Sequence, residues 1–213
     1  MKLSVNLFMT LDGVNQAPGS PDEDRRGGFH EGGWLMAYFD EGCGREVDRW
    51  FSRCDELLLG RNTFDAFSSY WSQVTDEGDS VARILSERPK HVVTSRHLEG
   101  EWASTSHPLS GDFLNDIRLL KKQESEKELQ VHGSIQLARE LHETGMIDIY
   151  RLLIAPVVVG EGAGIFYGSG PAYSMRVTHH AVTDSGVTSL ELEPGDFVSD
   201  RSPAIREGRS IIE

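Results

Sequence analysis

Residues 129–145 read LQVHGSIQLARELHETG, and this stretch predicts a buried strand, a glycine turn and a helix. Apolar residues alternate from Leu129, and Gly133 permits a sharp turn with positive φ. Ser134 is a favourable N-cap, and Gly145 is well placed to end the helix. Such a turn directs the N–H groups of a helix start towards the sheet edge, where they can bind an anion. An ordinary strand–helix turn is the alternative interpretation.

The bulk composition is typical of a soluble globular protein. The 213 residues suffice for a domain with a substantial core, and the hydrophobic (38%) and charged (26%) fractions are ordinary. The net charge of −13 argues against a nucleic-acid surface, which needs a basic face. No apolar run reaches membrane-spanning length, and the N-terminus alternates like a strand rather than a signal peptide. Two cysteines without a CxxC pair indicate packed, reduced thiols, so we expect a cytoplasmic protein without nucleic-acid or membrane partners.

Strand patterns alternate with helical patterns along the chain. A helix over 41–55 would carry Cys43 and Cys54 on one side. Pro156 falls inside a predicted strand, where we expect a bulge or an edge. Further helices are predicted near 64–71 and over 80–86, 112–123 and 135–143, and strands over 3–11, 56–59, 90–95, 102–109, 129–132, 149–159, 175–183 and 186–193.

This alternation predicts the fold class. It favours a three-layer α/β/α sandwich with a mostly parallel, mixed central sheet and an antiparallel hairpin at its C-terminal end. The pattern gives one domain over residues 1–194, followed by a polar tail over 195–213. The tail and hairpin lie outside a minimal cofactor scaffold, so a homodimer is expected.

A long loop and a group of aromatic residues follow the first strand. Residues 14–33 are rich in Gly, Pro, Asp and Arg, and loops of this length are usually lids, binding loops or disordered segments. Trp34, Tyr38 and Phe39 come next. They could bind a flat heterocyclic substrate by stacking, and core packing is the alternative.

Five segments, in this order, carry a family resemblance. They are SVNLFMTLDG (4–13), LLLGRNTF (57–64), HVVTSR (91–96), VHGSIQLARELHETGMID (131–148) and LLIAPVVVGEGAGIF (152–166). Together they resemble the dihydrofolate reductase-like superfamily, and within it the bacterial branch related to the C-terminal reductase domain of bifunctional riboflavin-biosynthesis deaminase/reductase proteins. The resemblance runs from Leu3 to about Leu192 and implies a dihydrofolate reductase-like fold.

The resemblance implies an NADPH site along the carboxyl ends of the strands. It places the adenosine 2′-phosphate near Arg61, whose planar guanidinium suits phosphate; a surface ion pair is the alternative. It places the pyrophosphate at Gly133. The family often has a second glycine directly before this position, where this chain has His132. We assign no catalytic role to His132. The implied cofactor-binding residues are Gly60, Arg61, Asn62, Thr63, Thr94, Ser95, Arg96, Gly133, Ser134, Ile135, Gln136, Gly160 and Gly162.

The substrate end has one candidate catalytic residue and one departure from the family. Asp12 closes the first strand beside the implied nicotinamide position, where it could orient a substrate or relay a proton; an Asp-Gly turn is the alternative. Dihydrofolate reductases resemble each other in a carboxylate about four helical turns before GR-x-T, and here that count reaches Gly44-Arg45. Dihydrofolate is therefore in doubt, and the proton donor stays open between Asp12, Glu46 and water.

The main functional hypothesis is an NADPH-dependent oxidoreductase. It would transfer a hydride to a C=N or C=O carbon of a small planar heterocyclic substrate. The first alternative is the 5-amino-6-ribosylamino-pyrimidine phosphate reductase of riboflavin biosynthesis, which needs a second phosphate site. The second alternative is a catalytically inactive dinucleotide-binding or structural dimer.

Overall fold

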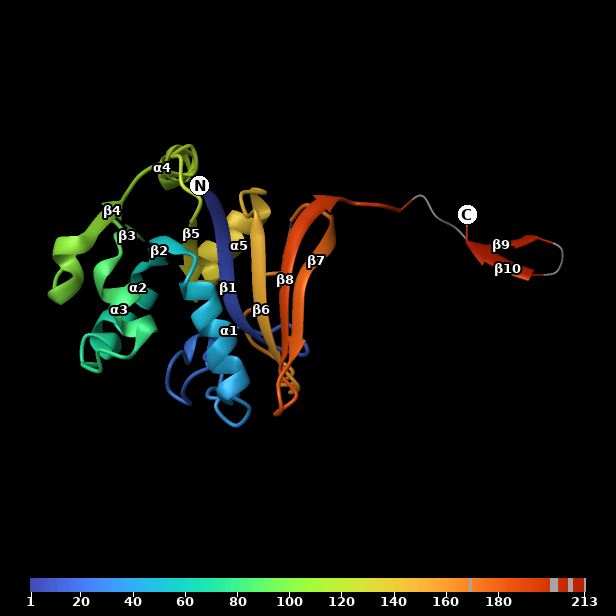
Figure 1. Ribbon diagram of the computed structural model, residues 1–213, viewed down its shortest axis with the longest axis horizontal. Coiled ribbons are helices and arrows are strands. Elements are labelled where there is room, and N and C mark those ends of the chain that lie inside the picture. The colour runs from blue at the N-terminus through green and yellow to red at the C-terminus, as the bar shows by residue number, and fades with distance from the viewer. Residues whose placement is uncertain (169, 200–202, 207–208, 213) are drawn as a thin grey trace.

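An eight-stranded mixed sheet organises the protein (Figure 1). Its strands are β1 (Lys2–Thr10), β2 (Cys54–Gly60), β3 (Lys90–Val93), β4 (Ser106–Leu109), β5 (Glu128–His132), β6 (Ile149–Ala155), β7 (Tyr173–Val182) and β8 (Thr188–Asp196). The structure is a computed structural model and describes residues 1–168, 170–199, 203–206 and 209–212. The strand order is β4-β3-β2-β5-β1-β6-β8-β7. The first six strands are parallel, and β8 pairs antiparallel with β6 and β7.

Helices cover both faces of this sheet. They are α1 (Glu41–Phe51), α2 (Arg61–Trp71), α3 (Ser80–Glu87), α4 (Phe113–Lys121) and α5 (Ile135–Glu143). α4 and α5 pack on the face that carries Leu58, whereas α1, α2 and α3 pack on the face that carries Leu57 and Leu59. Neighbouring residues of a strand point to opposite faces, so these are two separate layers. The predicted three-layer sandwich with a C-terminal antiparallel hairpin is confirmed.

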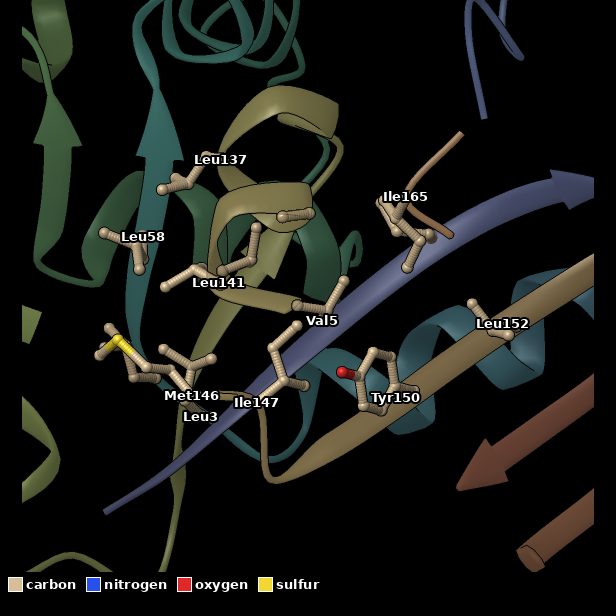
Figure 2. Close-up of a cluster of buried hydrophobic side chains, with 14 of the residues drawn as sticks. Leu3, Val5, Leu58, Leu137, Leu141, Met146, Ile147, Tyr150, Leu152 and Ile165 are labelled. Atoms are coloured by element: carbon tan, nitrogen blue, oxygen red, sulfur yellow. The ribbon is translucent and has the colours of Figure 1, made fainter. Parts of the chain in front are cut away.

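The larger core lies beneath α5. Figure 2 shows Leu137 and Leu141 of α5 on the side of the sheet that carries Leu58 of β2 and Val5 of β1. All four side chains are buried. Burial of such side chains contributes about 1.5–3 kcal/mol each. This packing holds the start of α5 at the carboxyl edge of the sheet.

The turn that enters α5 and the turn that leaves it both need positive φ. Gly133 has φ +57° and Gly145 has φ +66°. After α5, the N–H of Gly145 donates to the His142 carbonyl and that of Met146 donates to the Leu141 carbonyl, which is a Schellman motif. The predicted strand–glycine–helix unit and its C-terminal glycine are confirmed.

Three predicted element boundaries are wrong. α1 ends at Phe51, and Cys54 belongs to β2, where it pairs with Glu128, so the two cysteines do not share a helix. Both thiols are nevertheless free and buried. β6 ends at Ala155, because the next residue, a proline, has no N–H to continue the ladder. Residues 101–105 form a 3₁₀ helix, and only Ser106–Leu109 form a strand.

A buried charge network crosses the sheet beneath α1. Arg151 is fully buried and forms two hydrogen bonds, of 2.6 and 2.7 Å, with the carboxylate of Glu128. Its Nε donates to Glu191 at 2.6 Å, and Nη1 donates to the Asn6 amide oxygen. Burial alone would raise the pKa of Glu191, but the hydrogen bonds and charge of Arg151 outweigh it and lower that pKa to about 2. Glu191 is therefore ionised beside the Arg151 guanidinium, and the buried polar groups of the network satisfy each other's hydrogen bonds.

The C-terminal segment contains strand structure. β8 continues to Asp196, past the expected domain boundary at 194. β9 (Pro203–Arg206) and β10 (Arg209–Ile212) form a separate antiparallel pair within the expected tail. Residues 200–202, 207–208 and 213 of that tail lie outside the described residues. Among the described residues, no helix is long and apolar enough to cross a bilayer.

Candidate functional site

A cleft of about 480 Å³ opens at the carboxyl edge of the parallel strands. Three segments line it: residues 16–29 of the long loop, residues 135–139 at the start of α5, and residues 161–163 after β6. In open α/β sheets ligands bind outside the carboxyl ends of the strands. Ile135, Gln136 and Gly162, which we expected to bind the cofactor, line the cleft.

Two turns at this edge brace each other. The Gly60 N–H, at the end of β2, donates to the Ser134 hydroxyl over 2.9 Å. The Ser134 N–H donates in return to the Thr63 hydroxyl over 3.0 Å. A Cβ atom placed on Gly133 would lie 3.4 Å from the Thr63 methyl, so the two turns are in close contact. Four expected cofactor-binding residues, from segments 70 residues apart in the sequence, are thus brought together.

The predicted capping role of Ser134 is wrong. Its side chain makes no hydrogen bond to the first turn of α5, and the residue has left-handed backbone angles, φ 51° and ψ 50°. The hydroxyl bonds Gly60 instead, because the reciprocal brace with Thr63 turns the side chain towards β2. Each hydroxyl accepts a backbone N–H, and its own hydrogen remains able to donate to a ligand.

The residues that we expected at the adenosine end are Arg61, Asn62 and the segment after β3. The Arg61 Nε lies 2.8 Å from both carboxylate oxygens of Asp65, and Nη1 donates to the His97 carbonyl over 2.9 Å. The surface ion pair that was the alternative interpretation of Arg61 is therefore present. The Nη2 atom of Arg61 makes no hydrogen bond with Asp65 or His97. The Asn62 side chain makes no hydrogen bond within the described part of the chain, and the residue is exposed. The contact with His97 joins α2 to the loop that contains Thr94, Ser95 and Arg96.

The loop after β3 has a defined local structure. The Thr94 hydroxyl accepts the Arg96 N–H over 3.1 Å, which closes a tight turn. Thr94 is buried, whereas the side chains of Ser95 and Arg96 are exposed at the carboxyl edge. The structure thus leaves Ser95 and Arg96 accessible to a ligand and gives Thr94 a supporting position.

Asp12 holds two loops together. Its carboxylate accepts the Thr10 hydroxyl over 2.6 Å and the Gly160 N–H over 2.8 Å, with a weaker contact from Val159. The Thr10 hydrogen bond, helped by these N–H groups, holds the pKa of Asp12 below its ordinary value. The Asp12 carboxyl group is thus an anion at neutral pH. An anion is better suited to orienting a substrate than to donating a proton to it. The other expected candidate, Glu46, accepts from Ser189 in β8 over 2.8 Å and faces away from the cleft.

Gly162 allows the long loop to approach closely. It has φ +129°, and a Cβ there would lie 2.6 Å from Val14 and 3.0 Å from Phe29. A side chain at this position would displace the loop that covers the cleft. Gly160 also has positive φ, at +85°, and open space around it. Both glycines are thus required by the backbone, and Gly162 in addition shapes the cleft.

The three expected substrate-binding aromatic residues differ in accessibility. Trp34 is 7% exposed and donates from Nε1 to the Gln16 carbonyl over 2.8 Å, which favours the packing alternative. Tyr38 is half-buried and packs against the same hydrophobic cluster as Trp34. Phe39 is 39% exposed and meets Phe8 edge to face, with 6.3 Å between ring centroids. Phe39 is the member of this group that retains an open face.

The long loop is fixed by two side chains that the sequence reasoning missed. The Asn15 amide donates to the Phe8 carbonyl over 2.7 Å, and its oxygen accepts the Ile165 N–H. The Gln16 amide donates to the carbonyls of Asp24 and Arg26, and its oxygen accepts from Ala163 over 3.0 Å. Both residues are buried. The sequence carried no signal for these roles, because they depend on burial and on the N–H groups of Ala163 and Ile165, which lie 147 and 150 residues further along the chain.

His132 points away from the cleft. Its ring stacks on Phe51 of α1, with centroids 4.2 Å apart and planes 5° apart, and Nε2 bonds the Gln130 side chain. Burial, together with the nearby charge of Arg151, lowers the pKa of His132 to about 3. The residue is therefore a neutral core group.

The fold and this edge define the class of protein: an α/β reductase scaffold of the dihydrofolate reductase-like type. The chain belongs to the RibD C-terminal domain family, whose model matches residues 1–189. Membership confirms the predicted resemblance and supports a reductase of the riboflavin-biosynthesis type, with a dinucleotide cofactor and a small-molecule substrate.

Individual relatives are distant in sequence. The chain is 23% identical over 191 residues to the uncharacterized protein YyaP of Bacillus subtilis strain 168, covering 89% of this chain and 93% of YyaP. It matches the structure of a "putative riboflavin biosynthesis protein" from Shewanella sp. PV-4 with a TM-score of 0.66, 20% identity and coverage of 92% and 100%. It also matches RibD of Acinetobacter baumannii with a TM-score of 0.59 and 12% identity, over 92% of this chain and 58% of that one. These structures share the fold.

Proposed function

We propose that the protein is an NADPH-dependent reductase that transfers a hydride to a C=N or C=O carbon of a small planar heterocycle. The observation that carries the proposal is the braced pair of turns at Gly60 and Ser134, beside a cleft of about 480 Å³. Family membership supports the same reaction class.

The residues at the braced turns fit a dinucleotide. Gly133 brings the backbone close to Thr63 without a side chain in between, which is the arrangement a diphosphate needs. The hydroxyls of Thr63 and Ser134 and the first N–H groups of α5 would hold the diphosphate. Arg61 and the exposed Ser95 and Arg96 would hold the adenosine end, and the positive charge there favours NADPH over NADH.

In the proposed reaction the chain positions and shields the reacting groups. A bound reduced nicotinamide supplies the hydride. The long loop, fixed by Gln16, covers one wall of the cleft and excludes water. Phe39 would pack against the heterocycle. Asp12, held as a carboxylate, would orient a polar substrate group, and water would deliver the proton because Glu46 faces β8.

The aminopyrimidine reductase of riboflavin biosynthesis is the second candidate, favoured by the family itself. One structural relative, from Thermotoga maritima, is named a deaminase and 5-amino-6-(5-phosphoribosylamino)uracil reductase; this chain covers 56% of it. A reductase of this kind needs a site for the substrate phosphate.

Isothermal titration with NADPH and with NADH tests the proposal. We expect saturable binding of both, with NADPH tighter, and weaker binding after Thr63→Val. Ser68→Ala is the matched control, because Ser68 lies on the same helix and donates to the Asp65 carbonyl. Absence of binding at millimolar cofactor would exclude the proposed function. Binding without oxidation of NADPH across a panel of pterins, pyrimidines and imines would instead favour an inactive dinucleotide-binding protein.

We further propose a cytoplasmic homodimer. The two buried free thiols, Cys43 and Cys54, suit a reducing compartment. Light scattering coupled to gel filtration would measure the mass, and a monomer at micromolar concentration would contradict the dimer.

A further inference from the structure

Two arginines that the sequence reasoning left unassigned line the cleft. Arg26 comes from the long loop, and Arg139 comes from the middle of α5. Both lie at the rim of the same cavity as Gln136 and Gly162. The other charged residues of the lining are Asp24 and Glu161, and Asp24 is already paired with Arg26, so Arg139 is the guanidinium of this cleft that has no ion-pair partner in the described part of the chain.

Arg139 is an oriented cation without a carboxylate partner in the described part of the chain. Its Nε and Nη2 both donate to the Gly164 carbonyl, over 3.1 and 2.6 Å. That carbonyl fixes the guanidinium plane but leaves its charge uncompensated. The side chain is half-buried, so water screens it less than it would screen a surface arginine. A charge in this position is stabilised by an anionic ligand.

Arg26 is anchored through its backbone and can exchange its side-chain partner. The buried Gln16 amide holds the carbonyls of Asp24 and Arg26 over 3.1 and 3.0 Å, which fixes this segment at the rim. The Arg26 side chain forms a fork with Asp24, with distances of 2.8 and 2.6 Å. The Arg26 side chain is 58% exposed and the Asp24 side chain 16%, so the guanidinium is accessible to a second anion while it is paired. A phosphate in the cleft can therefore compete with Asp24 for it.

We propose that Arg139 and Arg26 form a clamp for a phosphoryl group of the ligand in this cleft. Arg139 supplies a fixed guanidinium, and Arg26 turns from Asp24 to the phosphate when the ligand enters. Guanidinium groups bind phosphate oxygens in pairs, which gives orientation as well as affinity. The phosphate belongs either to the dinucleotide or to a phosphorylated sugar on the heterocyclic substrate. The clamp rests on the proposed function for the identity of its ligand.

Titration calorimetry on four variants tests the clamp, with NADPH, inorganic pyrophosphate, and ribose 5-phosphate added to the NADPH-saturated protein. Arg139→Gln and Arg26→Gln should each raise the dissociation constant of the phosphate-bearing ligand, by about tenfold to a hundredfold for Arg139 and less for Arg26. Asp24→Asn keeps the shape but removes the competing charge, so it should tighten binding severalfold. Arg45→Gln, an exposed site on α1, is the control.

The three probes separate the sources of the phosphate. Weaker binding of NADPH and pyrophosphate assigns the clamp to the dinucleotide, and weaker binding of ribose 5-phosphate alone assigns it to the substrate. Unchanged constants in Arg139→Gln and Arg26→Gln, or weaker binding in Asp24→Asn, would overturn the clamp. If the native protein binds pyrophosphate through these arginines but not NADPH, the clamp stands and the proposed function fails. Thermal unfolding of each variant shows whether it is folded, and the exposed Arg26 site keeps the test valid if Arg139→Gln is not.

Discussion

Replacing Ser134 by alanine and by glycine separates its effect on stability from its effect on binding. The residue has φ 51°, and its hydroxyl accepts the Gly60 N–H over 2.9 Å. Alanine removes the hydrogen bond and keeps a Cβ in the left-handed region. Glycine also removes the hydrogen bond but relieves the left-handed strain.

The expected magnitudes follow from these two contributions. Loss of the bond to Gly60 costs about 1 kcal/mol, and the left-handed conformation costs a non-glycine residue about 1 kcal/mol. Ser134→Ala should therefore lower the free energy of unfolding by about 1 kcal/mol, whereas Ser134→Gly should stay near the native value. In a chain of this size, 1 kcal/mol corresponds to a Tm difference of roughly 2–4 °C. Both variants lack the hydroxyl, so both should bind a dinucleotide about fivefold to tenfold more weakly.

Urea unfolding and calorimetric titration on the same preparations measure both quantities. An alanine variant as stable as the glycine variant would refute the strain argument. Native affinity in both variants would refute the assignment of the hydroxyl to the ligand.

Three further predictions concern the core and the edge of the sheet. Arg151→Met leaves the carboxylates of Glu128 and Glu191 buried without their shared partner, so chemical denaturation should show a loss of about 3–5 kcal/mol, and a loss below 1 kcal/mol would contradict the network. His132 stays neutral in the folded protein down to a pKa of about 3 while the unfolded chain takes up its proton near pH 6.5, so stability should fall as the pH drops from 6.5 towards 3. His132→Gln should flatten this slope by up to about 1.4 kcal/mol per pH unit, and an unchanged slope in urea titrations would place the histidine in water. Asp12→Asn should lower kcat/KM by less than about a hundredfold without moving the pH profile, whereas loss of an acidic limb would show that Asp12 donates the proton.

The local patterns predicted the elements because their causes are local. The helical repeat from Ile135 to Leu141 and the glycine at 145 are short-range features, and the structure confirms them. The sequence could place Gly133 at a turn for the same reason. Boundaries failed where tertiary pairing decides: Cys54 continues a helical stripe in sequence, but it pairs with β5 in the sheet.

The candidate site was predictable only in part. Family motifs located the two turns, but the bond between Gly60 and Ser134 joins residues 74 positions apart, so no local pattern indicates it. Ser134 matches a helix cap by residue type, and its actual role depends on that distant partner. Gln16 and Arg139 were missed for a similar reason: their meaning depends on the carbonyls and N–H groups of the loop after β6.

A crystal structure with NADP⁺ bound tests the central claim most directly. We predict that the diphosphate lies within hydrogen-bonding distance of the Thr63 and Ser134 hydroxyls at the start of α5, with the nicotinamide directed towards Asp12. A dinucleotide bound away from the carboxyl edge of the sheet, with the Gly60–Ser134 turns empty, would contradict the account.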